Sequence, residues 1–66
     1  MLCNEDILKV MDDGNYTMQT KFIGNVTHVQ TKKHGQLIGI IEQLTSSIIK
    51  INQCGKTYTV ERQDLL

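Results

Sequence analysis

The sequence contains only two cysteines, Cys3 and Cys54, and they stand far apart in the chain. A disulfide framework in a small secreted domain needs several cysteines, so we do not expect disulfides to stabilise this fold. No signal-peptide segment precedes Cys3, and the longest apolar run is too short to cross a membrane. We therefore expect a reduced, cytoplasmic protein without a membrane partner.

Cysteine and histidine also lack the spacing of a metal site. Structural zinc sites use close ligand pairs, typically two cysteines with about two to four residues between them. Cys3 and Cys54 have no such neighbour, and His28 and His34 lie on either side of an expected turn. The sequence therefore predicts no metal and no other cofactor.

Catalytic residues are equally sparse. Cys54 and His34 are a possible nucleophile and base, because a histidine can activate a nearby thiol. A catalytic site also needs an orienting group and an oxyanion hole within a pocket, and a chain of 66 residues has little concave volume for one. We therefore expect a protein that is not an enzyme.

The chain has no net charge, which argues against a dedicated polyanion binder, but its charges are unevenly distributed. Residues 1–19 carry four acidic side chains and one lysine, whereas residues 20–59 carry five lysines and one glutamate. These two parts can complement each other, or they can leave a basic face for a partner.

The first expected element is a short helix over residues 5–12. Asn4 is a suitable N-cap, and Gly14 is a typical helix stop. The apolar residues that recur at helical spacing are Ile7, Val10 and Met11. The helix is too short to persist unaided in water, so it must dock on the rest of the fold.

Residues 16–30 are weakly patterned, and we interpret them as one bent strand or two. Gly24 is expected to mark a bulge or bend, since glycine within a strand pattern often does so. Such a bend lets Phe22 and Val29 both point into the core.

Residues 32–64 predict a compact β meander, because short runs rich in Ile, Val, Thr and Tyr alternate with turn residues. The runs are Leu37–Leu44, Ile48–Ile51 and Thr57–Val60. The turn Asn52–Gly55 is expected to form a hairpin in which Gly55 supplies a positive φ.

The expected facing of these strands follows from their alternation. Ile49 and Ile51 share one face, and Tyr58 and Val60 point inward. Leu37–Leu44 is apolar on both faces, so we expect cover on both sides, with Ile40 and Val60 in the core.

Several segments together resemble the SH3-like and Sm-like small β-barrels. They are Lys33–Gly35, Gly39–Glu42, Ile49–Ile51, Gly55–Val60 and Asp64–Leu65. The resemblance covers roughly residues 20–66 and implies a mainly β fold, a small five-stranded barrel with one short N-terminal helix. We expect a single domain over residues 1–66, with the barrel starting at about residue 17. The aromatic cluster with which SH3 domains hold proline-rich peptides is missing, so no ligand follows from the resemblance.

One candidate site is the basic loop of residues 32–35. Lysines neutralise phosphates, and an aromatic ring such as Phe22 or Tyr58 can stack on a base. The barrel lacks an arginine for bidentate contacts, however. Nucleic-acid or nucleotide binding is therefore the alternative function, and its candidate contacts are Lys32, Lys33, His34 and Lys56.

The other candidate site is an aliphatic surplus that exceeds what so small a core can hold. Its members are Leu8, Leu37, Ile40, Ile48 and Leu66. An exposed aliphatic patch usually marks a protein interface, although the helix could cover these residues instead. We expect a homo-oligomer, most simply a dimer, and a protein-binding module. The small size suits a regulator or inhibitor of a larger protein complex, of the kind that mobile elements encode.

Overall fold

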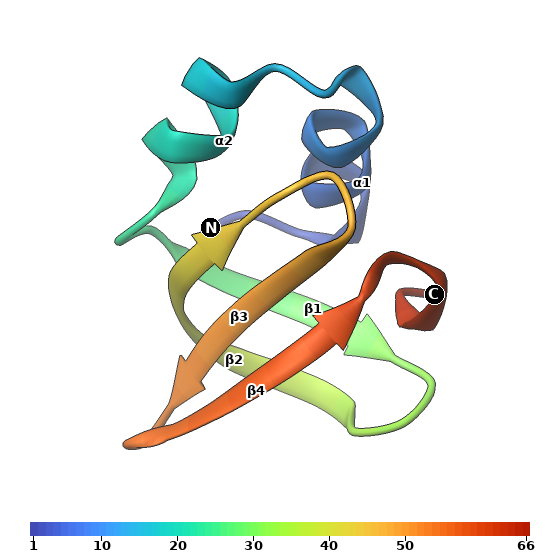
Figure 1. The fold of residues 1–66 in the computed structure, drawn as a ribbon. Helices are drawn as coiled ribbons and strands as arrows, with labels where there is room; N and C mark the ends of the chain where they lie inside the picture. Colours follow the sequence, from blue (N-terminus) through green and yellow to red (C-terminus); the bar gives the residue numbers. More distant parts are fainter.

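The computed structural model describes residues 1–66 and shows two helices followed by four strands. The elements are α1 (Asn4–Asp13), α2 (Tyr16–Phe22), β1 (Val26–Thr31), β2 (Gly35–Leu44), β3 (Ile48–Gln53), β4 (Lys56–Glu61) and the 3-10 helix η1 (Arg62–Asp64). The strands form one antiparallel sheet in the order β1-β2-β3-β4 (Figure 1). The fold is mainly β, as predicted. The prediction of a five-stranded barrel is wrong, because four strands form an unclosed sheet.

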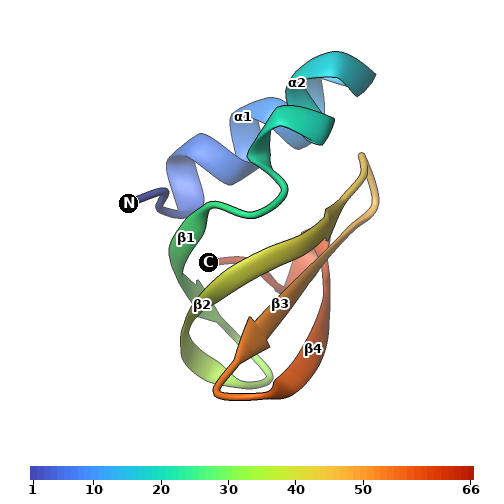
Figure 2. The same ribbon diagram turned by 90° about the vertical axis from the view of Figure 1, so that its left-hand side faces the viewer.

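The prediction of a single helix is also wrong, since the start of the expected bent strand forms α2. The Asn15 side chain caps this helix by accepting the backbone N–H of Met18 at 3.2 Å. α2 buries only Gln19, so it lacks the apolar stripe by which a helix is recognised in a sequence. Both helices lie on the same side of the sheet (Figure 2).

Helix α1 starts one residue earlier than predicted, with Cys3 rather than Asn4 at the N-cap. The carboxylate of Asp6 accepts the backbone N–H of Cys3 at 2.9 Å and its thiol at 3.2 Å. These hydrogen bonds, the backbone one foremost, hold the pKa of Asp6 below its usual value. The helix ends at Gly14, with a φ of 65°, as predicted.

Strand β2 bends so that its first half pairs with β1 and its second half with β3. A Cβ atom at Gly39 would lie 2.1 Å from the backbone oxygen of Asn52, so only glycine permits this close approach. A register shift between Ile41 and Gln43 marks a bulge in the second half. The sheet therefore curls around its inner face.

The core fills this curled face. Ile7, Val10 and Met11 of α1 are buried in it, which confirms the predicted stripe. The buried strand and C-terminal residues of the core are Val29, Leu37, Ile41, Leu44, Ile49, Ile51, Val60 and Leu65.

The predicted facing is confirmed for the later strands and wrong for Ile40. Ile49, Ile51 and Val60 are fully buried, and Tyr58 packs against the core. Ile40 is 41% exposed, because Leu37 and Ile41 point inward and the alternation turns Ile40 to the other face.

The two outer edges of the sheet differ. The edge of β1 is covered by both ends of the chain, through a parallel bridge from Leu2 to Thr27 and an antiparallel bridge from Leu65 to Thr31. Asn4 strengthens this cover, since its side chain donates to the carbonyls of Gln30 and Leu66 and accepts the N–H of Gln30. Strand β4 pairs only with β3. Neither helix is long and apolar enough to cross a membrane.

Candidate interaction surfaces

The outward face of β1 and β2 carries three half-exposed aliphatic side chains. Val26, Ile38 and Ile40 are 44%, 42% and 41% exposed. Val26 is directly opposite Ile40 in the register, and His28 is opposite Ile38. Neighbouring cross-strand side chains on one face lie in contact range, so the three aliphatic residues form one surface, the outer apolar face.

The outer apolar face carries no charged side chain. Next to Ile40 in the register lies Asn52 of β3. The carboxylate of Glu42, two residues beyond Ile40, accepts hydrogen bonds from Thr57 and Asn52. The negative charge of Glu42 is therefore held over β3 and β4.

The five predicted interface residues do not form one surface. Leu37 is 2% exposed and belongs to the core, which corrects its assignment to an interface. Leu8 and Ile48 are half-buried, and Leu8 packs against the core. Ile40 lies in the outer apolar face, whereas Leu66, at 65% exposed, lies beside Gln30 on the edge of β1.

Ile38 was missed because the run Leu37–Leu44 is apolar on both faces, and Val26 because its segment is weakly patterned. The signal that distinguishes the two faces of β2 is Gly39. A glycine with no room for a Cβ atom faces the other half of the sheet, so its two neighbours must face outward.

The predicted nucleic-acid contacts are partly brought together by Tyr58. The His34 ring meets the Tyr58 ring edge to face, with centroids 5.1 Å apart. The Nζ atom of Lys56 lies 5.0 Å from the Tyr58 centroid, within cation–π range. We call His34, Lys56 and Tyr58 the basic–aromatic cluster. The backbone N–H of Lys32 donates to the carbonyl of Asp64 at 2.8 Å.

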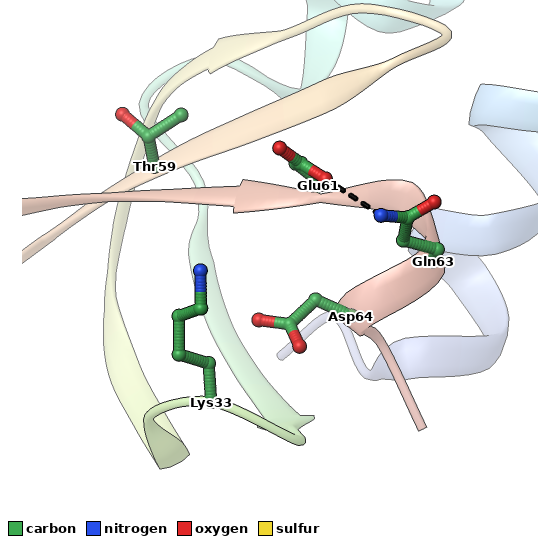
Figure 3. A pocket seen from close by; sticks show the side chains of 5 residues that line it. All are labelled: Lys33, Thr59, Glu61, Gln63 and Asp64. Carbon is green, nitrogen blue, oxygen red and sulfur yellow. Dashed lines mark hydrogen bonds between the residues drawn. The ribbon is translucent and has the colours of Figure 1, made fainter.

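A small polar notch lies where β4 runs into η1, facing the turn between β1 and β2 (Figure 3). Its volume is about 200 Å³. The lining side chains are Lys33, Thr59, Glu61, Gln63 and Asp64, none of them hydrophobic. The carboxylate of Glu61 accepts the side-chain N–H of Gln63 at 2.9 Å. In Figure 3, Lys33 extends toward the notch from the turn between β1 and β2, and Asp64 from η1.

A wider, shallow hollow of about 410 Å³ lies at the covered edge of β1. Its lining residues are Cys3, Asn4, Glu5, His28, Gln30 and Leu66. It brings Cys3 rather than Cys54 to a histidine, but the thiol of Cys3 is hydrogen-bonded to Asp6. No three His, Cys, Asp or Glu side chains gather in a way that could hold a metal ion.

The chain was compared with protein-family models, with curated proteins and with solved structures, and none of them matches it. Its function must therefore be argued from these surfaces alone.

Proposed function

We propose that this chain is a non-enzymatic protein-binding module, a small regulator or inhibitor of a larger protein complex, whose outer apolar face holds a second copy of the chain. The observation that carries this proposal is the contiguous exposure of Val26, Ile38 and Ile40. A contiguous apolar surface on a small domain is typical of a protein interface. The resemblance to SH3-like and Sm-like barrels belongs to the same proposal, because folds of this size are mostly docking surfaces.

A second copy suits the outer apolar face because a two-fold interface places each residue near its own equivalent. Charged residues at such a centre would meet like charges, and this face has none. The zero net charge of the chain also removes overall repulsion between copies at neutral pH. A standard interface buries about 800 Å² per partner, so it must extend beyond the three aliphatic residues to their polar neighbours.

Light scattering at micromolar concentration tests this assignment. We expect a mass of about twice 7.5 kDa, and we expect Ile40→Lys to convert the protein into a monomer. Met18→Lys on α2 is the matched control, because Met18 is 40% exposed and lies outside the face. A monomer at every dilution, or equal disruption by both substitutions, would contradict the assignment.

The basic–aromatic cluster supports a second candidate function, binding of single-stranded nucleic acid. Two of the four predicted contacts, His34 and Lys56, lie against the one aromatic ring of the sheet. A site of this kind loses affinity steeply with salt, with a log–log slope of about −0.7 per phosphate contact.

The two candidates separate in one experiment. Replacing His34 and Lys56 with Glu should abolish oligonucleotide binding if the basic–aromatic cluster is the functional site. The same replacement at Lys21 and Lys50 controls for net charge. If oligonucleotides bind at physiological salt and only the first double variant fails to bind, the nucleic-acid function replaces the protein-binding one.

A further inference from the structure

Strand β4 presents unpaired backbone groups on its outer edge. The turn after β3 contains only Cys54 and Gly55, both with positive φ, so Gln53 and Lys56 form the hydrogen-bonded pair that closes the hairpin. In an antiparallel pair, residues alternate between bonding the partner strand and facing away from it. The residues of β4 whose N–H and C=O groups face away are Thr57, Thr59 and Glu61.

These three residues leave their backbone groups available. All three side chains are exposed, and no backbone hydrogen bond outside the helices and strands involves their N–H groups. The edge is also neither bulged nor interrupted by proline, the devices that commonly block strand addition. A further extended segment can therefore pair with β4.

The polar notch gives this edge a chemical preference. Two of the edge-facing residues, Thr59 and Glu61, also line the notch. The notch holds the carboxylates of Glu61 and Asp64 against the single ammonium of Lys33, so it carries a net negative charge. The only ion pair within hydrogen-bond distance in the chain joins Arg62 to Asp12, so neither notch carboxylate is committed to a cation.

We propose that the free edge of β4 binds an extended peptide segment of a protein partner by strand addition, with a lysine or arginine of that segment in the polar notch. Backbone hydrogen bonds supply the affinity in this mode, and the side-chain pocket supplies the specificity. The proposal rests on the proposed protein-binding function, but it uses a surface separate from the outer apolar face.

A second copy of this chain fits the edge less well than such a segment. If β4 paired with its own equivalent, the side chains at the edge-facing positions would again be Thr57, Thr59 and Glu61. None of them is basic, so the two notch carboxylates would gain no cation. The outer apolar face, which lacks charges, suits self-association, whereas the edge suits a basic segment.

The probe is a blocked peptide as long as β4, with alternating threonine and valine and one central lysine. Binding is followed by NMR of the full chain. We expect shifts and slowed amide exchange at Thr57, Thr59 and Glu61. A matched peptide with N-methyl groups on the edge-facing residues cannot donate these bonds, and we expect it not to bind.

The contribution of the notch charges and that of the backbone hydrogen bonds of β4 are then tested separately. Replacing the central lysine of the peptide with glutamate, or Glu61 with Gln in the chain, should weaken binding by about two- to fivefold, as expected for loss of a cross-strand charge pair. Thr59→Pro removes an outward N–H and should abolish binding, while Tyr58 and Val60 keep their bonds to β3. If this variant fails to fold, the N-methylated peptide tests the same bonds.

Three results would overturn the proposal. The first is slow exchange of the edge amides in the free chain, which would assign the edge to a second copy. The second is peptide-induced shifts at Val26 and Ile38 instead of β4. The third is tighter binding of the glutamate peptide than of the lysine peptide. Dimer dissociation by Ile40→Lys leaves these measurements unaffected, so failure of the edge and failure of the outer apolar face remain distinguishable.

Discussion

The two outer edges of the sheet differ in whether their outward backbone groups are hydrogen-bonded. Along β1, backbone groups pair with Leu2 and Leu66, and the side chain of Asn4 fills the space between these two chain ends. Along β4, the outward groups pair with nothing in the chain. The two chain ends therefore bond to the edge of β1 in the place that a fifth strand would occupy. An edge left bare while its counterpart is covered by both chain ends is the natural place for a partner strand.

Both edges belong to one bent sheet, and the bend depends on Gly39. Of the substitutions considered, Gly39→Ala should therefore lower the free energy of unfolding the most. The new Cβ atom would overlap the Asn52 backbone, which no side-chain movement can relieve. Overpacking that side-chain shifts can relieve costs about 1–3 kcal/mol, but this clash is with the backbone, and we expect its cost to exceed the total stability of about 3–10 kcal/mol for a chain of this length. We expect no cooperative transition in thermal denaturation followed by circular dichroism.

Gly35→Ala is the matched control for that experiment. Gly35 has a φ of 67°, but nothing lies within 4 Å of its added Cβ atom. We expect it to cost only the backbone strain, about 1–2 kcal/mol. An equal loss in both variants would show that close approach at Gly39 is not what holds the bend.

The next largest loss of stability is expected from a substitution in the core between the two edges. Ile51 is fully buried, so Ile51→Ala should cost about 2–5 kcal/mol in the free energy of unfolding. Ile40→Ala, on the outward face, should cost clearly less in the monomer. Denaturant midpoints of the two variants give the comparison, and equal midpoints would mean that Ile40 is packed as firmly as the core.

Asn4→Ala should make the edge of β1 resemble that of β4. The substitution removes three hydrogen bonds, at 2.7, 2.8 and 2.9 Å, that join α1, Gln30 and Leu66. Each bond contributes about 0.5–1.5 kcal/mol net, and we expect a total loss of about 1–3 kcal/mol. Amide exchange at Gln30 should become faster. Asn4→Asp keeps the acceptor for Gln30 but turns a carboxylate oxygen toward the carbonyls of Gln30 and Leu66, so we expect it to speed amide exchange at Gln30 at least as much as Asn4→Ala.

The smallest effect is a pH dependence at the end of β4. Arg62 donates two hydrogen bonds to Asp12, at 2.8 and 2.9 Å, and these hold the pKa of Asp12 below its usual value. A folded pKa below the unfolded one, about 3.9, means that the contribution is complete above that pH and disappears as the pH falls through the folded pKa. Both side chains are about half exposed, so the contribution is small.

Urea titrations between neutral pH and pH values below the carboxylate range measure this dependence. Asp12→Asn should flatten it without removing the part that comes from Asp6, whose pKa is also lowered. An unchanged profile in Asp12→Asn would show that the ion pair does not form in solution.

Sequence reasoning succeeded where one residue dictates the local backbone. Gly14 and Gly55 have the positive φ values expected of a helix stop and a hairpin turn, and the alternation of Ile49 and Ile51 fixes the inner face of β3. It failed where tertiary contacts decide. α2 contains the strand-forming residues Tyr16 and Phe22, and only the cap at Asn15 indicates a helix.

The candidate surfaces were predictable to a similar extent. Ile40 was expected both in the core and in the aliphatic surplus, and only the second agrees with its exposure, whereas His34 and Lys56 were identified as candidate basic contacts. Their neighbours Ile38 and Tyr58 depend on the register of the folded strands, which the sequence alone did not specify. The free edge of β4 follows from a sheet of four strands that does not close, and the expected five-stranded barrel did not indicate it.

The burial of Gln19 has a consequence for the motions of the molecule. Gln19 is the only buried residue of α2, and its amide donates to the carbonyl of Val10 at 3.4 Å and to the hydroxyl of Ser46 at 3.1 Å. Beside these two polar contacts, the half-buried ring of Phe22 packs against the core, and a helix with so few buried side chains has a low free energy of local opening. We therefore expect helix α2 to open before the sheet does, and each opening uncovers the part of β2 that the helix contacts.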